Sequence, residues 1–137
     1  MEDKKVTLAS LVSKTGNNKY AELCGNLLHC RDVIHLNHWK VRGDGSFAAH
    51  EALGDLYDAL QDHADDITEL IQSYVGVMSI TVPQSTAEAP LPYLEKTRTM
   101  LVSKLKGMET EMPDVSNKLQ DLIADISKTI YKLKNLA

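Results

Sequence analysis

The sequence predicts an all-α protein built as a single bundle of four helices. Apolar side chains recur in four separate segments at the three- and four-residue spacing of a buried helical stripe. Two of the breaks between these segments are short, whereas the middle break is long and rich in proline. The 137 residues suit one domain with one core, so the whole chain is expected to form a single domain.

The first two predicted helices flank a glycine-rich corner. The first helix covers residues 19–41, and the Gly-Asp-Gly sequence at residues 43–45 ends it. Ser46 is a candidate N-cap for the second helix, which covers residues 47–74. Residues 1–18 precede both helices and are expected to form a peripheral N-terminal arm.

The long middle break, residues 76–92, has the composition of a connection between helices. Extended, it reaches roughly 56 Å, whereas the second helix spans roughly 42 Å, so the connection can cross the whole bundle. The third helix is predicted at residues 93–112 and the fourth at residues 114–136. Pro113 and Asp114 mark a brief break and a cap between them, so these two helices are expected to be antiparallel neighbours.

Composition and charge exclude several classes of function. The net charge of −4 argues against a nucleic-acid binder, because phosphate binding needs a concentrated basic surface. No apolar run approaches the roughly 20 residues that span a bilayer, and no signal peptide is evident, so a cytoplasmic protein is expected. Cys24 and Cys30 lie on different sides of one predicted helix and are expected to be free, buried thiols.

Two histidines and two carboxylates form a candidate metal site. His38 and His50 lie on either side of the corner, and Asp65 and Glu69 are four positions apart on one helical face. Such a mixed nitrogen and oxygen ligand set suits iron. However, about 22 Å of helix separates His50 from Asp65, so one subunit cannot close the site. Either the two pairs serve unrelated purposes, or a twofold-related second copy brings its carboxylates to the first copy's histidines.

These residues resemble the signature of a known family. The His-Trp-x-Val-x-Gly segment that begins at His38, a second His twelve residues later, and Asp-x-x-x-Glu from Asp65 to Glu69 resemble the ferroxidase signature of the Dps proteins, the ferritin-like proteins of starved bacteria. The resemblance implies a ferritin-like four-helix bundle with a long crossover between the second and third helices. It also implies that His38 and His50 bind iron together with Asp65 and Glu69 of a neighbouring subunit.

The function that this resemblance implies is a ferroxidase that oxidises Fe(II) with hydrogen peroxide or oxygen and sequesters the product. The assembly would be a homo-oligomer of twofold dimers, in that family a twelve-subunit shell. Zinc can substitute for iron, since nitrogen and oxygen sites rarely exclude it on affinity alone. Asp58 and Asp62 share the acidic stripe of Asp65 and are candidate carboxylates beside the ligands. Trp39 and Phe47 match the family's aromatic positions near the site.

One position departs from the family's pattern and keeps an alternative function open. The family usually has another carboxylate four residues after the second His, where this chain has Gly54, and Asp55 points about 100° away from that position. Gly54 therefore favours the alternative, a non-catalytic ferritin-like bundle for oligomerisation or partner binding, with a vestigial metal site. A nucleoid-binding role is the weakest hypothesis, because the charge is wrong. None of the remaining histidines is assigned to the site: His29, His35 and His63.

Overall fold

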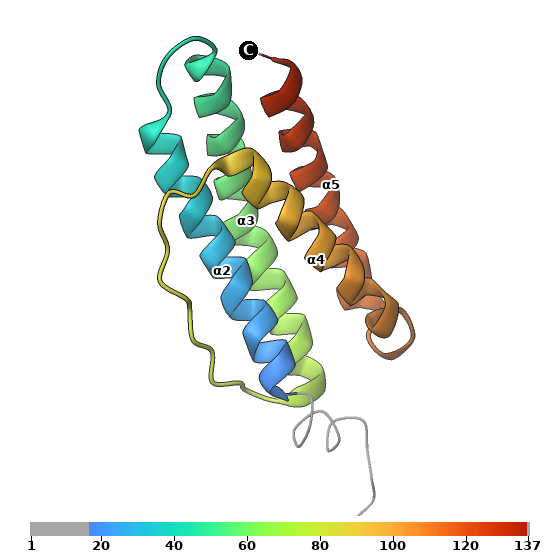
Figure 1. The fold of residues 1–137 in the computed structure, drawn as a ribbon. Coiled ribbons are helices and arrows are strands. Elements are labelled where there is room, and N and C mark those ends of the chain that lie inside the picture. The colour runs from blue at the N-terminus through green and yellow to red at the C-terminus, as the bar shows by residue number, and fades with distance from the viewer. Residues whose placement is uncertain (1–16, 137) are drawn as a thin grey trace, which may run out of the picture.

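The computed structural model describes residues 17–136 and contains four helices in that range and no strand. They are α2 (Asn17–Lys40), α3 (Ser46–Val75), α4 (Pro90–Glu111) and α5 (Pro113–Asn135). In Figure 1, α2 and α5 run in one direction, and α3 and α4 run in the other. The helix α3 packs on both α2 and α5, whereas α4 packs mainly on α5. The prediction of an all-α four-helix bundle is confirmed. None of the described helices is long and apolar enough to cross a lipid bilayer.

The predicted apolar stripes of the four helices meet in one core. Fully buried side chains come from every helix, and they include Leu27, Ile34, Leu53, Leu60, Ile67, Leu94, Leu101, Leu119 and Leu122. Met108 and Met112 are buried, and Met100 packs against the core. Cys24 and Cys30 are free and buried, as predicted. Burial raises the pKa of the Cys30 thiol to about 12, which keeps it protonated and unreactive.

Several helix boundaries differ from the predicted ones. The helix α4 begins at Pro90 rather than at residue 93, because the first turn of a helix tolerates proline, whose missing N–H has no acceptor there. The connection is therefore residues 76–89. Ser46 is not the N-cap of α3: Gly45 takes that position with φ of 76°, and Ser46 is the first helical residue. Of the predicted arm, residues 1–16 lie outside the described residues, and residues 17 and 18 belong to α2.

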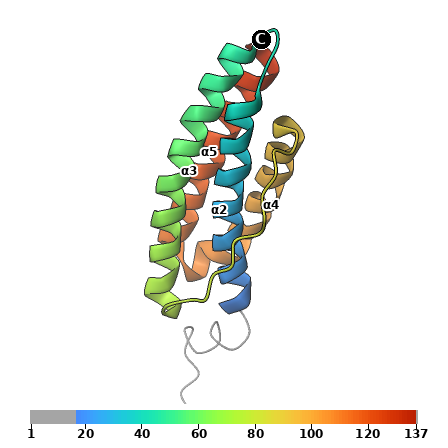
Figure 2. The same ribbon diagram turned by 90° about the vertical axis from the view of Figure 1, so that its left-hand side faces the viewer.

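The connection between α3 and α4 runs back along α2 (Figure 2). The side chain of Asn37 donates a hydrogen bond of 2.7 Å to the carbonyl oxygen of Glu88, and the His29 Nδ1 lies 2.8 Å from the Ser85 Oγ. At Gly25 the connection approaches so closely that an added Cβ would lie far inside contact distance of the Thr81 carbonyl oxygen. Because the connection returns along α2 in this way, α4 points in the same general direction as α3, although the axes of the two helices are inclined to each other (Figure 1).

Replacing Gly25 by alanine is expected to destabilise the protein by about 1–3 kcal/mol, because the Cβ would displace the backbone of the connection from α2. The matched control is Gly107→Ala in α4, where an added Cβ meets nothing within 4 Å. That substitution should stabilise the helix by up to about 1 kcal/mol. Urea unfolding of both variants measures the difference. Equal stability of the two variants would contradict the close approach at Gly25.

Tyr74 near the end of α3 is joined to Asp114 at the start of α5. The Tyr74 hydroxyl donates a hydrogen bond of 2.7 Å to the Asp114 carboxylate and thereby lowers the pKa of that carboxyl below its ordinary value of 3.8. A lowered pKa in the folded state stabilises the protein above the unfolded pKa, and this contribution is lost as the pH falls through the folded value. Tyr74→Phe is therefore expected to destabilise the protein at pH 7 and to have less effect near pH 3. Unfolding experiments on the wild type and on Tyr74→Phe at both pH values measure this effect. If the hydrogen bond did not form, the difference in unfolding free energy between the two proteins would be the same at pH 7 and at pH 3.

Candidate metal centre

His38 and His50 form a reciprocal pair at the corner between α2 and α3. His38 lies in the last turn of α2 and His50 in the second turn of α3. Their rings are stacked, with centroids 3.7 Å apart and planes inclined by 19°. The Nδ1 of each ring lies 2.7 Å from the backbone carbonyl oxygen of the other histidine. Gly43 and Gly45 have φ of 90° and 76°, which lets the chain turn tightly enough to bring the two rings together.

The reciprocal hydrogen bonds determine which ring nitrogens are available to a ligand. A carbonyl oxygen can only accept, so each Nδ1 must carry its proton and donate it. In the neutral imidazoles the Nε2 atoms then bear the lone pairs. A histidine that binds a metal usually donates its other ring N–H to a carbonyl or carboxylate in this way, which fixes the tautomer and the orientation of the ring. The environment of both histidines therefore suits a pair of metal ligands.

The stacking of the two rings limits how they can bind ions. The lone pair of each Nε2 lies in the plane of its ring, and the two planes are nearly parallel and separated by the stacking distance. An ion bound at about 2.0–2.1 Å from both nitrogens would lie well outside at least one of these planes. In this arrangement, each imidazole is therefore suited to its own ion or to a water molecule bound to one.

Gly54 provides the space that the ring of His38 occupies. A Cβ added at Gly54 would lie 2.9 Å from the His38 Cε1 and 3.1 Å from its Nδ1. The imidazole thus packs directly on the backbone of α3. At the position where the resembled family has a carboxylate, this chain requires a residue without a side chain, so the departure at Gly54 follows from the position of His38.

Asp65 and Glu69 are not brought to the histidine pair within the chain. Both carboxylates are exposed and lie farther along the same continuous helix. The rise of this helix therefore separates Asp65 from His50 by about 22 Å. The side chain of Gln61 is 3.5 Å from the Asp65 carboxylate. Asp58 and Asp62 are exposed as well. Within residues 17–136, no three His, Cys, Asp or Glu side chains lie close enough to hold a metal ion.

An aromatic cluster extends from the histidine pair to the surface. The His35 ring stacks on Tyr57 at 3.9 Å and lies 4.0 Å from the indole of Trp39, and Tyr57 lies 5.3 Å from the His38 ring. His35 therefore packs beside the histidine pair through its contacts with Tyr57 and Trp39. Its position one turn before His38 on α2 could have suggested this placement. Trp39 and Phe47 are 66% and 76% exposed, so neither covers the histidines within one chain.

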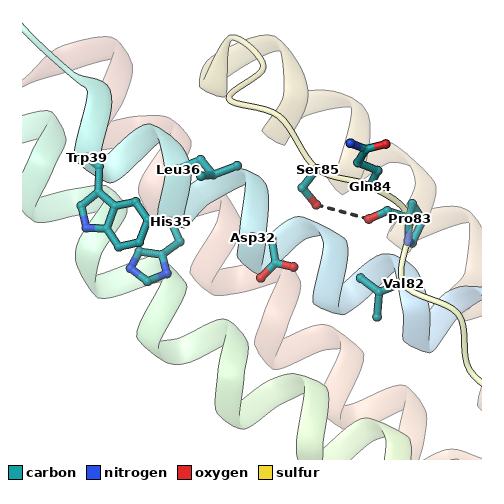
Figure 3. Close-up of a pocket in the computed structure, with 8 residues that line it drawn as sticks. All are labelled: Asp32, His35, Leu36, Trp39, Val82, Pro83, Gln84 and Ser85. Atoms are coloured by element: carbon teal, nitrogen blue, oxygen red, sulfur yellow. Dashed lines mark hydrogen bonds between the residues drawn. The ribbon is translucent and has the colours of Figure 1, made fainter.

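Beside this cluster, α2 and the connection enclose an open groove of about 520 Å³. Figure 3 shows Trp39 and His35 on one side of this groove and residues 82–85 on the other. Asp32 and Leu36 complete its lining. The outer face of α2 next to the histidine pair is therefore both hollowed and partly apolar.

The other two histidines, His29 and His63, contact residues away from the histidine pair. The His63 Nε2 lies 2.7 Å from the Asp125 carboxylate and joins α3 to α5. His29 lies against the connection, where its Nδ1 contacts Ser85. These partners are distant in the sequence, so no local pattern could have indicated them.

These observations define an all-helical bundle with a paired-histidine site at the corner of its α2–α3 hairpin. The chain belongs to a family of unknown function, DUF5856, whose match covers residues 38–133. This range contains both histidines and both carboxylates of the predicted site. No curated protein and no solved structure shows significant similarity to the chain.

Proposed function

We propose that the protein binds ferrous ions at sites shared between two subunits and oxidises them, like the Dps proteins that its sequence resembles. The observation that carries the proposal is the reciprocal pairing of His38 and His50, which directs both Nδ1 protons to carbonyl oxygens and leaves both Nε2 atoms for metal. Asp65 and Glu69 of the second subunit would complete the ligand set. The iron is the substrate of the protein and its stored product.

The ligand set suits both oxidation states of iron. Each imidazole would help to hold its own ferrous ion, and the carboxylates would balance the added charge as the ions become ferric. Each ferrous ion gives up one electron, so two ions together reduce one molecule of hydrogen peroxide to water. With oxygen as the oxidant, the same transfer yields peroxide.

The charges of α2 and α3 favour a second copy of the chain as the partner. The helix α3 carries seven acidic residues and no lysine or arginine, whereas the histidine corner carries Lys40 and Arg42. A twofold axis midway between His50 and Asp65 would pass near Tyr57 of both copies. It would bring the acidic stripe of each copy to the histidine corner of the other, and opposite charges would meet. The exposed Trp39 and Phe47 would then be covered.

The course of the chain supports the ferritin-like part of the proposal. Ferritin-like bundles differ from simple up-down bundles by a long connection that places the second and third helices of the bundle parallel. Here residues 76–89 return along α2, and α3 and α4 point the same way (Figures 1 and 2). The short corners at residues 41–45 and at Met112 join the antiparallel pairs.

Aerobic titration of the protein with ferrous ion is expected to produce ferric-oxo absorbance faster than in buffer alone. His38→Ala should slow this reaction at least about tenfold, because it removes a ligand and the ring that donates to the His50 carbonyl oxygen. His63→Ala is the matched control, since His63 pairs with Asp125 away from the site. Anomalous scattering from an iron-soaked crystal would locate the metal, and zinc should compete for the same position. An unchanged rate in His38→Ala would refute the proposal.

The alternative, a non-catalytic bundle that keeps the fold for oligomerisation or partner binding, is favoured by one observation. Gly54 leaves the histidine pair without a carboxylate from its own subunit, because the His38 ring fills that space. Under this alternative, purified protein would form dimers but would not accelerate iron oxidation. The titration therefore separates the two functions.

A further inference from the structure

A second cleft lies between α2, α4 and the connection, on a different side of α2 from the groove of Figure 3. Its volume is about 300 Å³, which is at the lower end of the range for small-molecule sites. The buried side chains of Tyr93 and Thr97 line its interior. The remaining lining residues combine charged, polar and apolar side chains, and they are Asn26, His29, Pro83, Glu88, Lys96 and Met100.

At one end of this cleft, the His29 ring and the Glu88 carboxylate face each other. The His29 Nδ1 lies 2.8 Å from the Ser85 Oγ, and the dashed line in Figure 3 marks the longer contact of 3.4 Å from this hydroxyl to the Pro83 carbonyl oxygen. In the tautomer of this ring that donates its Nδ1 proton to the Ser85 Oγ, which an ammonium ligand would select, the lone pair lies on Nε2. This atom lies 3.9 Å from the Glu88 carboxylate, which is too far for a direct hydrogen bond. An ammonium nitrogen could lie about 2.8 Å from both acceptors and donate a proton to each.

The other groups of the cleft supply the opposite charge and an apolar wall. Within residues 19–136, the side chains of Lys96 and Asn26 have no hydrogen-bond or ion-pair partner, so both can donate to an anion. Met100 and the ring of Tyr93 offer apolar surface next to them. Cation-binding, anion-binding and apolar groups thus line a single cleft of small volume.

We propose that this cleft binds a free aliphatic α-amino acid. The ammonium group would lie between the His29 Nε2 and the Glu88 carboxylate, and the carboxylate of the ligand would bind Lys96 and Asn26. The side chain of the ligand would pack on Met100. This binding site is separate from the iron site and requires neither iron nor a second subunit.

Isothermal titration with L-leucine and L-methionine tests the proposal, together with two analogues of leucine. One analogue, 3-methylbutylamine, lacks the carboxylate, and the other, 4-methylpentanoate, lacks the ammonium group. At least one amino acid should bind with a stoichiometry of one per chain. Each analogue should bind at least about tenfold more weakly than leucine, because each loses a charge-assisted set of hydrogen bonds.

Two variants assign the binding to this cleft. Glu88→Gln and Lys96→Met should each weaken amino-acid binding at least about tenfold, because each removes one of the charges that the ligand needs. The control is Asp32→Asn, which changes a carboxylate in the groove of Figure 3 and should leave the affinity unchanged. Circular dichroism checks that all three variants are folded. The proposal fails if neither amino acid binds, if the analogues bind as well as leucine, or if Glu88→Gln keeps the wild-type affinity.

Discussion

Subunits carrying His50→Ala and subunits carrying Asp65→Ala are each expected to be inactive alone and to recover activity when they are unfolded together and refolded. If each site takes its histidines from one chain and its carboxylates from the other, a hybrid dimer has one site with both defects and one with neither. Random assortment makes half of the dimers hybrid, so the mixture should regain about a quarter of the wild-type rate of iron oxidation.

The physical basis of this complementation is the continuous helix α3. Because Ser46–Val75 is unbroken, Asp65 cannot fold back toward His50 of its own chain. A mixture of His38→Ala and His50→Ala subunits is the matched control, since both defects lie on the same side of the shared site. Hybrids of these two variants have no intact site and should stay inactive. If native mass spectrometry shows hybrids of His50→Ala and Asp65→Ala without any recovered activity, the ligands are not shared between subunits.

Gly54→Ala is expected to weaken iron binding about 10- to 100-fold, the usual effect of disturbing a group that orients a metal ligand. The new Cβ would lie 2.9 Å from the His38 Cε1. The ring would have to move, and this would strain its hydrogen bond to the His50 carbonyl oxygen and the stacking of the two imidazoles. Ferrous ion titration, with unfolding experiments in parallel, would separate this local effect from a loss of stability.

Gly107→Ala is the control for this variant as well, because it makes the same change in a helix without meeting any neighbour. It should bind iron like the wild type. The same geometry predicts that Gly54→Glu does not create an additional iron ligand, although it restores the carboxylate of the resembled family. Tighter iron binding in Gly54→Glu than in the wild type would show that the His38 ring can leave its position at little cost.

The pattern of apolar residues was sufficient to predict the four helices, because burial of one helical face leaves a periodic signal in the local sequence. The helix boundaries were less well determined. Pro90 and Pro92 looked like part of the connection, although the first turn of α4 accommodates both. Ser46 was predicted to be the N-cap of the second helix. In the structure Gly45, which has a positive φ, takes that position, so α3 begins at Ser46 and not at residue 47.

For the candidate site, the sequence by itself determined the separation between the two ligand pairs, because the rise of a continuous helix fixes the distance from His50 to Asp65. Only the tertiary structure decided that the two imidazoles are stacked and donate to each other's carbonyl oxygens, and that Gly54 makes room for His38. The same is true of the pairing of His63 with Asp125 and of the contact between His29 and the connection. These contacts depend on how neighbouring segments align against one another, and that alignment follows from the packing of the whole core rather than from any local pattern.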